Sequence, residues 1–264
     1  KKKNHFLNAS GAAVNFRLPR LHFSGIDFRA ERLEMPAYFC ASLATMPEKK
    51  LPLMSQLIDI SVAIHPRFPV WPTNRPLSIM QTDSMKSGSV ANVTRLETGS
   101  HTGTHIDAPL HFVDDAKTTE EIPLEKLVGK CQVLDFQGKK QITAADLEMA
   151  NLVPDVEKLL FKTDNSRLWD DLSHPFYEDF CALTADAAAW IVENGFHLVG
   201  IDYLSIQLFH DPPDTHVILL SKEVVIVEGL DLRQVQPGLY RLICLPLKIK
   251  GVEGTLARAV LETI

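Results

Sequence analysis

The 264-residue chain lacks the short motifs that identify several large enzyme classes. It has no G-x-S-x-G sequence, the strained turn that presents a serine nucleophile, so a serine hydrolase is unsupported. It has neither a G-x-G-x-x-G nor a G-K-[ST] loop, which weakens any nucleotide-dependent function. It has only four cysteines and no C-x-x-C pair, so free thiols in a reducing compartment are favoured and we expect a cytoplasmic protein.

The chain also has little that would suit a membrane or a nucleic acid. No apolar run approaches the roughly 18 residues that a membrane-spanning helix needs, so we expect no membrane partner. The net charge of -6 at pH 7 argues against a surface for nucleic acid. Its 45% hydrophobic and 23% charged residues are ordinary for a soluble domain, and 264 residues suffice for one α/β domain with a substantial core.

Charge divides the chain into two parts. Residues 1–53 carry nine Lys or Arg against four Asp or Glu, whereas the remainder carries 18 against 29. The first stretch has no sustained hydrophobic period and no apolar core of a secretory signal. We therefore expect residues 1–53 to be a poorly packed N-terminal extension and residues 54–264 to form the domain. Two interpretations of the extension are open: it is a transit peptide, or it is sequence upstream of a natural start at Met54.

The densest group of metal-binding side chains is the segment HTGTHIDAPLHF at residues 101–112. His101, His105, Asp107 and His111 all have odd numbers, so an extended backbone would project them to one side. Three β-branched residues, a glycine and Pro109 argue against a helix here, and we expect a strand end or rigid loop. Imidazoles and a carboxylate without a thiolate suit a catalytic Zn or Mn ion, whereas the alternative is a set of hydrogen-bonded surface histidines.

Around this segment the sequence predicts short strands and a few helices. We expect the ligands to lie at a sheet edge or end, because the strand Val90–Leu96 leads straight into them. Thr184–Asn194 is the clearest helix, with a Thr cap and Gly195 as its C-terminal stop, and Thr143 caps another helix start. The other predicted strands are Leu57–Ile64, Leu77–Thr82, Cys131–Phe136, Val156–Lys162, Phe196–Ile201, Val224–Val227, Tyr240–Leu245 and Ala257–Leu261.

Two segments rich in aromatic residues are candidates for a substrate pocket. Phe68 and Trp71 lie in a proline-rich loop, HPRFPVWPTNRP, which the prolines stiffen. The segment Trp169–Phe180, which contains Tyr177, is either a lid or subunit contact, or an ordinary loop held by its aromatics on the core. We expect its His174 to be structural.

The segment SHTGTHIDAPLHF resembles the HxGTHxDxPxH signature of the cyclase-like metal-dependent hydrolases, the family of bacterial kynurenine formamidases and isatin hydrolases. Further pieces follow in the family's order: FPVWP, GIDYLSI, THVILL, VEGL, and CLPLKIKG followed by ARAVL. The resemblance covers Ser55 to about Leu261. It implies an α/β fold: a single domain with a mixed β-sheet core flanked by helices, like the family's swivelling β/β/α fold.

The resemblance also implies roles for particular residues. His101, His105 and Asp107 resemble the ligands of one metal, while Asp107, His216 and Glu228 resemble those of a second, so Asp107 would bridge. Some family members work with a single ion, which leaves one or two ions open. His111 matches a histidine that the family uses as an acid or base. From the residues alone, Asp202 and His210 are more typical of a capping residue and a turn residue than of ligand partners.

The resulting hypothesis is a hydrolase that uses Zn or Mn to open an aryl formamide or cyclic amide, with N-formylkynurenine as a candidate substrate. Phe68, Trp71 and Tyr177 would form the apolar wall for a flat ring. An isatin-type lactam or lactone hydrolase is the alternative within the class, since GIDYLSIQLF departs from the version typical of dedicated kynurenine formamidases. A non-catalytic metal-binding protein is the alternative outside it. We expect a small aromatic amide as the ligand and a homo-oligomer, either a dimer or a tetramer.

Overall fold

The structure is a computed structural model that describes residues 6–7, 13–14, 55–170 and 176–264. By its internal contacts the chain divides into two units, Lys1–Leu53 and Met54–Ile264. In the first unit, β1 (Phe6–Leu7) pairs with β2 (Ala13–Val14) as antiparallel strands. The prediction that residues 1–53 are poorly packed falls almost wholly outside the described residues, as does His174.

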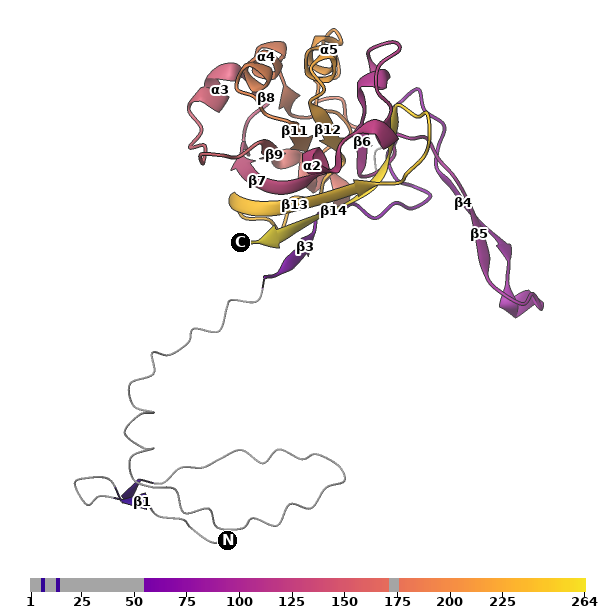
Figure 1. The fold of residues 1–264 in the computed structure, drawn as a ribbon. Helices are drawn as coiled ribbons and strands as arrows, with labels where there is room; N and C mark the ends of the chain where they lie inside the picture. The colour runs from indigo at the N-terminus through magenta and orange to yellow at the C-terminus, as the bar shows by residue number, and fades with distance from the viewer. Residues whose placement is uncertain (1–5, 8–12, 15–54, 171–175) are drawn as a thin grey trace. The chain divides into compact units, whose positions relative to one another are not determined.

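The second unit is an α/β domain built on one mixed sheet of eight strands, in the order β13-β7-β9-β11-β12-β6-β14-β3. β13 also pairs with β14, so the sheet curls and seven of its strands close into a barrel-like ring, with β3 outside it (Figure 1). The strands are β3 (Leu57–Asp59), β6 (His105–Asp107), β7 (Val128–Asp135), β9 (Lys158–Lys162), β11 (Leu198–Ile201), β12 (Val225–Glu228), β13 (Gly238–Pro246) and β14 (Gly254–Thr263).

The middle of the sheet is parallel and fully covered. β9, β11 and β12 read KLLFK, LVGI and VIVE, and every residue in them is buried. Strands buried on both faces read as continuous apolar runs, which is why the sequence predicted them. One apolar cluster lies on each face of these strands. The expected α/β fold with a mixed sheet is therefore confirmed.

Three of the four helices gather on one side of the sheet, whereas the short helix that begins at Leu124 packs against β7 and β13 (Figure 1). Thr143 caps the helix that follows it, accepting a bond from the Asp146 amide at 3.3 Å, and Gly195 follows the helix Ala185–Glu193 with a φ of 75°, so these two predicted helix signals are confirmed. The predicted Thr184 cap is only half right: Thr184 holds the N-cap position, but its hydroxyl donates to the Ile142 carbonyl at 3.0 Å and makes no capping bond to the helix. Among the described residues, no helix is long and apolar enough to cross a membrane. The helices are α2 (Leu124–Leu127), α3 (Ala144–Glu148), α4 (Ala185–Glu193) and α5 (Asp214–Ser221).

A two-stranded arm departs from the predicted sheet. β4 (Ser78–Asp83) and β5 (Val93–Glu97) pair only with each other and project away from the domain (Figure 1). The arm exposes several large apolar side chains, including Val90 at 98%, Met85 at 60% and Leu96 at 51% exposure. The predicted strand at Leu57–Ile64 is also shorter than expected, because its pairing with β14 covers only Leu57–Asp59.

Candidate metal centre

The centre is organised by β6, which lies inside the sheet between β12 and β14. Of the predicted sheet edge or end, the edge is wrong, because β5 leaves with the arm and β6 pairs instead with strands from the end of the chain. The end is right, because His105 begins β6 and Glu228 ends β12. His105 and Asp107 are two residues apart on β6, so they project to one face, and both are fully buried. Glu228 on β12 lies directly opposite His105 in the antiparallel register.

Two glycines allow the strands to meet closely here. Gly229 follows Glu228 with a φ of 71°, and a Cβ on it would lie only 2.1 Å from the carbonyl oxygen of Gly103. Thr104 ties the same two segments together by donating its hydroxyl to the Gly229 carbonyl at 2.6 Å. Glycine is thus required at position 229, where the loop that contains Gly103 crosses the end of β12.

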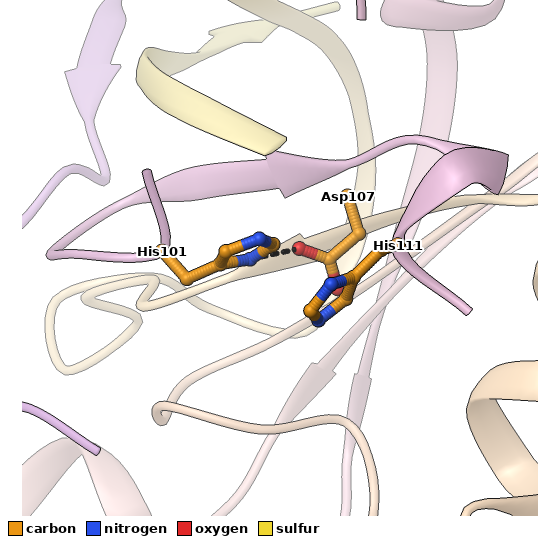
Figure 2. A group of neighbouring side chains, drawn as sticks. All are labelled: His101, Asp107 and His111. Carbon is orange, nitrogen blue, oxygen red and sulfur yellow. Dashed lines mark ion pairs between the residues drawn. The ribbon is translucent and has the colours of Figure 1, made fainter. Parts of the chain in front are cut away.

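The loop and turn on either side of β6 bring in the other two histidines of the segment. His101 precedes the strand, and its Nδ1 lies 2.7 Å from Asp107 Oδ1 (Figure 2). His111 follows on a 3₁₀ turn, Pro109–His111, which has proline at its first position and so loses no hydrogen bond there. The His101 and His111 rings stack, with centroids 3.9 Å apart. The segment is thus a short strand with a rigid loop and turn at its ends.

α5 brings in His216 from the second half of the chain. Its Nε2 lies 3.3 Å from Glu228 Oε1 and 3.8 Å from Asp107 Oδ2. Its Nδ1 lies 3.2 Å from Gln207 Oε1, and its ring stacks on Phe112 with centroids 4.5 Å apart. All six residues expected at the centre therefore converge in space.

Within this cluster two groups of three residues have ligand atoms close enough to share an ion: His101, Asp107 and His111, and His105, Asp107 and Glu228. The grouping differs from the one that the family resemblance implies, because His111 replaces His105 in one group and His105 replaces His216 in the other. Asp107 belongs to both groups.

Several buried polar atoms in the cluster have no hydrogen-bond partner: His105 Nε2 and both carboxylate oxygens of Asp107 at its centre, and His101 Nε2 at its outer edge, 3.4 Å from Glu253 Oε1. Buried polar atoms are normally satisfied, and leaving one unpaired costs about 1–3 kcal/mol. His105 Nδ1 lies 2.9 Å from the Gly103 carbonyl, which orients the ring so that Nε2 faces the carboxylates. Imidazole nitrogens and carboxylate oxygens aimed at one buried point fit a divalent cation.

Burial and neighbouring charges shift the pKa values in opposite directions. Burial alone would lower the pKa of His101, but the Asp107 carboxylate beside it raises it overall. Burial would raise the pKa of Asp107, yet the surrounding histidines, His101 first, lower it. The pKa of His111 is lowered, chiefly by burial. Burial and the Asp107 carboxylate would raise the pKa of Glu228, but the neighbouring imidazoles of His105 and His216 lower it overall. The carboxylates are thus ionised.

A cavity of about 300 Å³ opens onto the cluster. Trp71 lines it and packs against Phe176 and Phe209, at centroid distances of 5.2 and 5.1 Å. Phe68 does not line it, because its ring is buried and stacks on Trp169 at 5.5 Å. Tyr177 is not among the lining residues either. These are Trp71, Thr73, Asn74, His101, His111, Phe112, Leu204, Ser205, His216 and Glu228.

The structure also shows the roles of two polar residues that lie near His216 and Glu228 in the sequence. Asp202 is fully buried and accepts bonds from the backbone amides and hydroxyls of Thr163 and Ser166, so it caps the 3₁₀ helix Asp164–Asp170. His210 is 70% exposed on a turn. The interpretation of both as structural is confirmed.

Sequence reasoning missed two residues that contact the histidines, Gln207 and Glu253. Gln207 faces His216, as described above, and Glu253 Oε1 lies 3.4 Å from His101 Nε2. Glu253 falls in the gap between the CLPLKIKG and ARAVL segments, and the only available signal was its place beside Gly254.

Comparisons with known proteins show which family the chain belongs to. A family model described as "Putative cyclase" matches residues 58–207. Cyclase-like protein 1 of Arabidopsis thaliana is 36% identical over 78% of this chain and 84% of its own length. A kynurenine formamidase of Erythrobacter litoralis is 32% identical over 78% of this chain and 93% of its own. A solved structure described as a potential metal-dependent hydrolase with cyclase activity superposes with a TM-score of 0.68 at 31% identity, covering 80% of this chain and 98% of that one.

Proposed function

Because the chain belongs to the cyclase family, we propose that it is a metal-dependent hydrolase that opens an aryl formamide or a cyclic amide. The observation that carries the proposal is the convergence of six residues with metal-ligating or proton-transferring side chains, four of which line one cavity, with unpaired nitrogen and oxygen atoms among them. These six residues are His101, His105, Asp107, His111, His216 and Glu228.

His101, His105, Asp107, His216 and Glu228 would hold one or two divalent ions, Zn or Mn, with Asp107 bridging if there are two. The donors suit these ions because they are imidazoles and carboxylates, and the described cysteines are buried elsewhere. A bound divalent ion supplies Lewis acidity and lowers the pKa of a water molecule toward neutrality.

The chain's own side chains supply the rest. Cleaving an amide requires a proton at the departing nitrogen, and His111 lies in the cavity lining with its ring stacked on His101. Trp71, Phe112 and Leu204 give the cavity apolar walls that hold a flat ring and exclude water. Phe68 and Tyr177 lie outside the cavity lining and support the segments around it: Phe68 packs on Trp169, and the Tyr177 amide donates to the Tyr203 hydroxyl at 3.0 Å.

The lining of the cavity bears on which amide is cleaved. None of its described residues is Arg or Lys. A substrate with an amino-acid carboxylate, such as N-formylkynurenine, favours a bidentate Arg, whereas a simple aryl formamide or isatin does not. We therefore expect broad arylformamidase or cyclic-amide activity, with lactam or lactone opening as the second candidate on the same observation.

The test compares kcat/KM for N-formylkynurenine, formanilide and isatin, with Zn or Mn bound and after chelation. We expect activity that chelator removes and that metal restores, with values for the three substrates within about a hundredfold. A preference for N-formylkynurenine above about a hundredfold, or roughly 2.7 kcal/mol, would reject the broad specificity. A metal-bound protein that cleaves none of the three would favour the non-catalytic alternative.

We also propose that the protein is a cytoplasmic homo-oligomer, a dimer or tetramer. The arm supports this, because Ile79 on β4 lies directly opposite Leu96 on β5 and both are exposed, at 39% and 51%. Light scattering should give two or four copies for the parent and a smaller assembly for the double variant Ile79→Ser, Leu96→Ser. A parent that is monomeric at micromolar concentration rejects the proposal.

A further inference from the structure

Glu253 lies at a position that the proposed reaction does not use. It ends the connection before β14, and its neighbour Gly254 pairs with Asp107 on β6. Its Oε1 accepts a bond from the Ser100 hydroxyl at 2.6 Å and faces His101 Nε2 at 3.4 Å. The side chain is 39% exposed, so its carboxylate keeps contact with water on one side. Ser100 and Glu253 therefore flank the outer edge of the His101 ring.

The backbone next to Glu253 is shaped to the same ring. A Cβ on Gly254 would lie 2.4 Å from His101 Cε1 and 2.6 Å from Nε2, a distance at which something must shift. The His101 ring is therefore confined by Gly254 on one side and by the His111 ring on another, where the two ring centroids are 3.9 Å apart. A half-turn about the Cβ–Cγ bond would replace Nδ1 by Cδ2 at Asp107 and Nε2 by Cε1 at Glu253, so both contacts depend on the orientation of the ring.

All three histidines expected as ligands have an oxygen at their outer nitrogen. His105 Nδ1 faces the Gly103 carbonyl at 2.9 Å, and His216 Nδ1 faces the Gln207 amide oxygen at 3.2 Å. His101 is reversed: its Nδ1 faces Asp107 at 2.7 Å and its Nε2 faces Glu253. Glu253 is the only one of the three outer oxygens that carries a charge.

We propose that Glu253 is a positioning residue, which holds the proton of His101 on Nε2 and so presents Nδ1 to the metal. The inference rests on the proposed metal site. Outer partners of this kind fix the orientation and tautomer of a ligating histidine, and their loss costs about 10–100-fold in metal affinity. Ser100 acts one step further out, by anchoring the carboxylate that orients the ring.

The test is Zn²⁺ affinity, measured on the full chain by competition with a chromophoric chelator, so that it does not depend on any substrate. Glu253→Ala should weaken Zn²⁺ binding by about 10–100-fold. Glu253→Gln keeps an oxygen acceptor at the same place and should restore most of the affinity. Ser100→Ala should weaken binding in the same direction but by less. The matched control is Glu262→Gln on β14, the strand that Glu253 precedes; Glu262 contacts Arg241 and none of the histidines.

Equal Zn²⁺ affinity for Glu253→Ala and Glu262→Gln overturns the inference, as does a Glu253→Gln variant no better than Glu253→Ala. Melting curves of the metal-free variants identify a general loss of folding, which would lower the melting temperature of both Glu253 variants alike and also count against a positioning role. A parent whose Zn²⁺ affinity depends on Glu253 but which hydrolyses no amide leaves the inference standing and rejects the proposed function. A parent that hydrolyses amides with no dependence on Glu253 does the reverse.

Discussion

Asp107 and Asp202 are the same chemical group at the same burial, and both are fully excluded from solvent. Asp202 accepts four hydrogen bonds, from the amide and hydroxyl of Thr163 at 2.9 and 2.6 Å and from those of Ser166 at 3.2 and 2.8 Å. Asp107 has no hydrogen-bond partner of suitable geometry on either oxygen. Its neighbours are the nitrogens of His101, His105 and His216, at 2.7 to 3.8 Å.

The difference separates a structural carboxylate from one built for a ligand. Burying a charge is costly unless hydrogen bonds or an opposite charge compensate, and at Asp202 the fold supplies four hydrogen bonds that offset part of the cost. Burial raises the pKa of Asp202 even so, whereas the histidines lower that of Asp107. A second carboxylate, Glu228, shares the Asp107 cluster. Two buried carboxylates surrounded by histidines form an arrangement that a cation completes.

Asp107→Asn should have the largest effect, reducing hydrolysis to the rate of metal-free protein, because the residue belongs to both possible metal groups. The metal-free variant should melt close to the parent or above it, since the change removes repulsion with Glu228. Metal at a hundred times its dissociation constant should stabilise the parent by about 2.7 kcal/mol and leave the variant unchanged. Calorimetry with and without Zn²⁺ checks both statements, and a variant that still gains stability from metal would contradict them.

His111→Ala tests whether His111 transfers a proton or belongs to the metal ligands around Asp107. If His111 moves the proton, turnover should fall by roughly 10²-fold while metal content stays near that of the parent. His111 also lies within ligand distance of His101 and Asp107, which is the arrangement expected if it is a metal ligand instead. Metal analysis of the purified variant decides, because a matching loss of metal would make His111 a ligand.

Asp202→Asn should act on stability alone. Asparagine keeps the shape but cannot accept all four bonds, so unfolding should become easier by about 1–3 kcal/mol. In a domain of this size that corresponds to a fall in melting temperature of roughly 2–4 °C per kcal/mol. Zn²⁺ affinity should match that of the parent. A change in metal affinity with unchanged stability would erase the distinction between the two aspartates.

Deleting residues 1–53 should have the smallest effect, with melting temperature, metal affinity and turnover all close to those of the parent. The reason is the basic charge of this stretch and its lack of a hydrophobic period. The same three assays check it. A large fall in melting temperature would show that the extension packs on the domain or on a second copy. The Asp107→Asn and Asp202→Asn variants would then also be measured in the truncated chain, to separate their effects from that of the extension.

Local pattern alone predicted a good part of the protein. The buried strands follow from apolar runs, the helix after Thr143 from its cap, and the end of the helix Ala185–Glu193 from a terminal glycine, all signals that act over a few residues. The spacing from His101 to His111 placed four polar side chains within reach of one another, because an extended segment and a short turn leave little freedom. The sequence thus determined which segment carries the centre.

Tertiary pairing decided how the centre is completed. His216 and Glu228 are more than a hundred residues from Asp107 in the chain and meet it only because β6 inserts between β12 and β14. The same insertion brings Glu253 to His101, and it leaves β4 and β5 as an arm. Which strands pair depends on how the whole sheet buries its apolar faces, and no local pattern in the sequence contains that information.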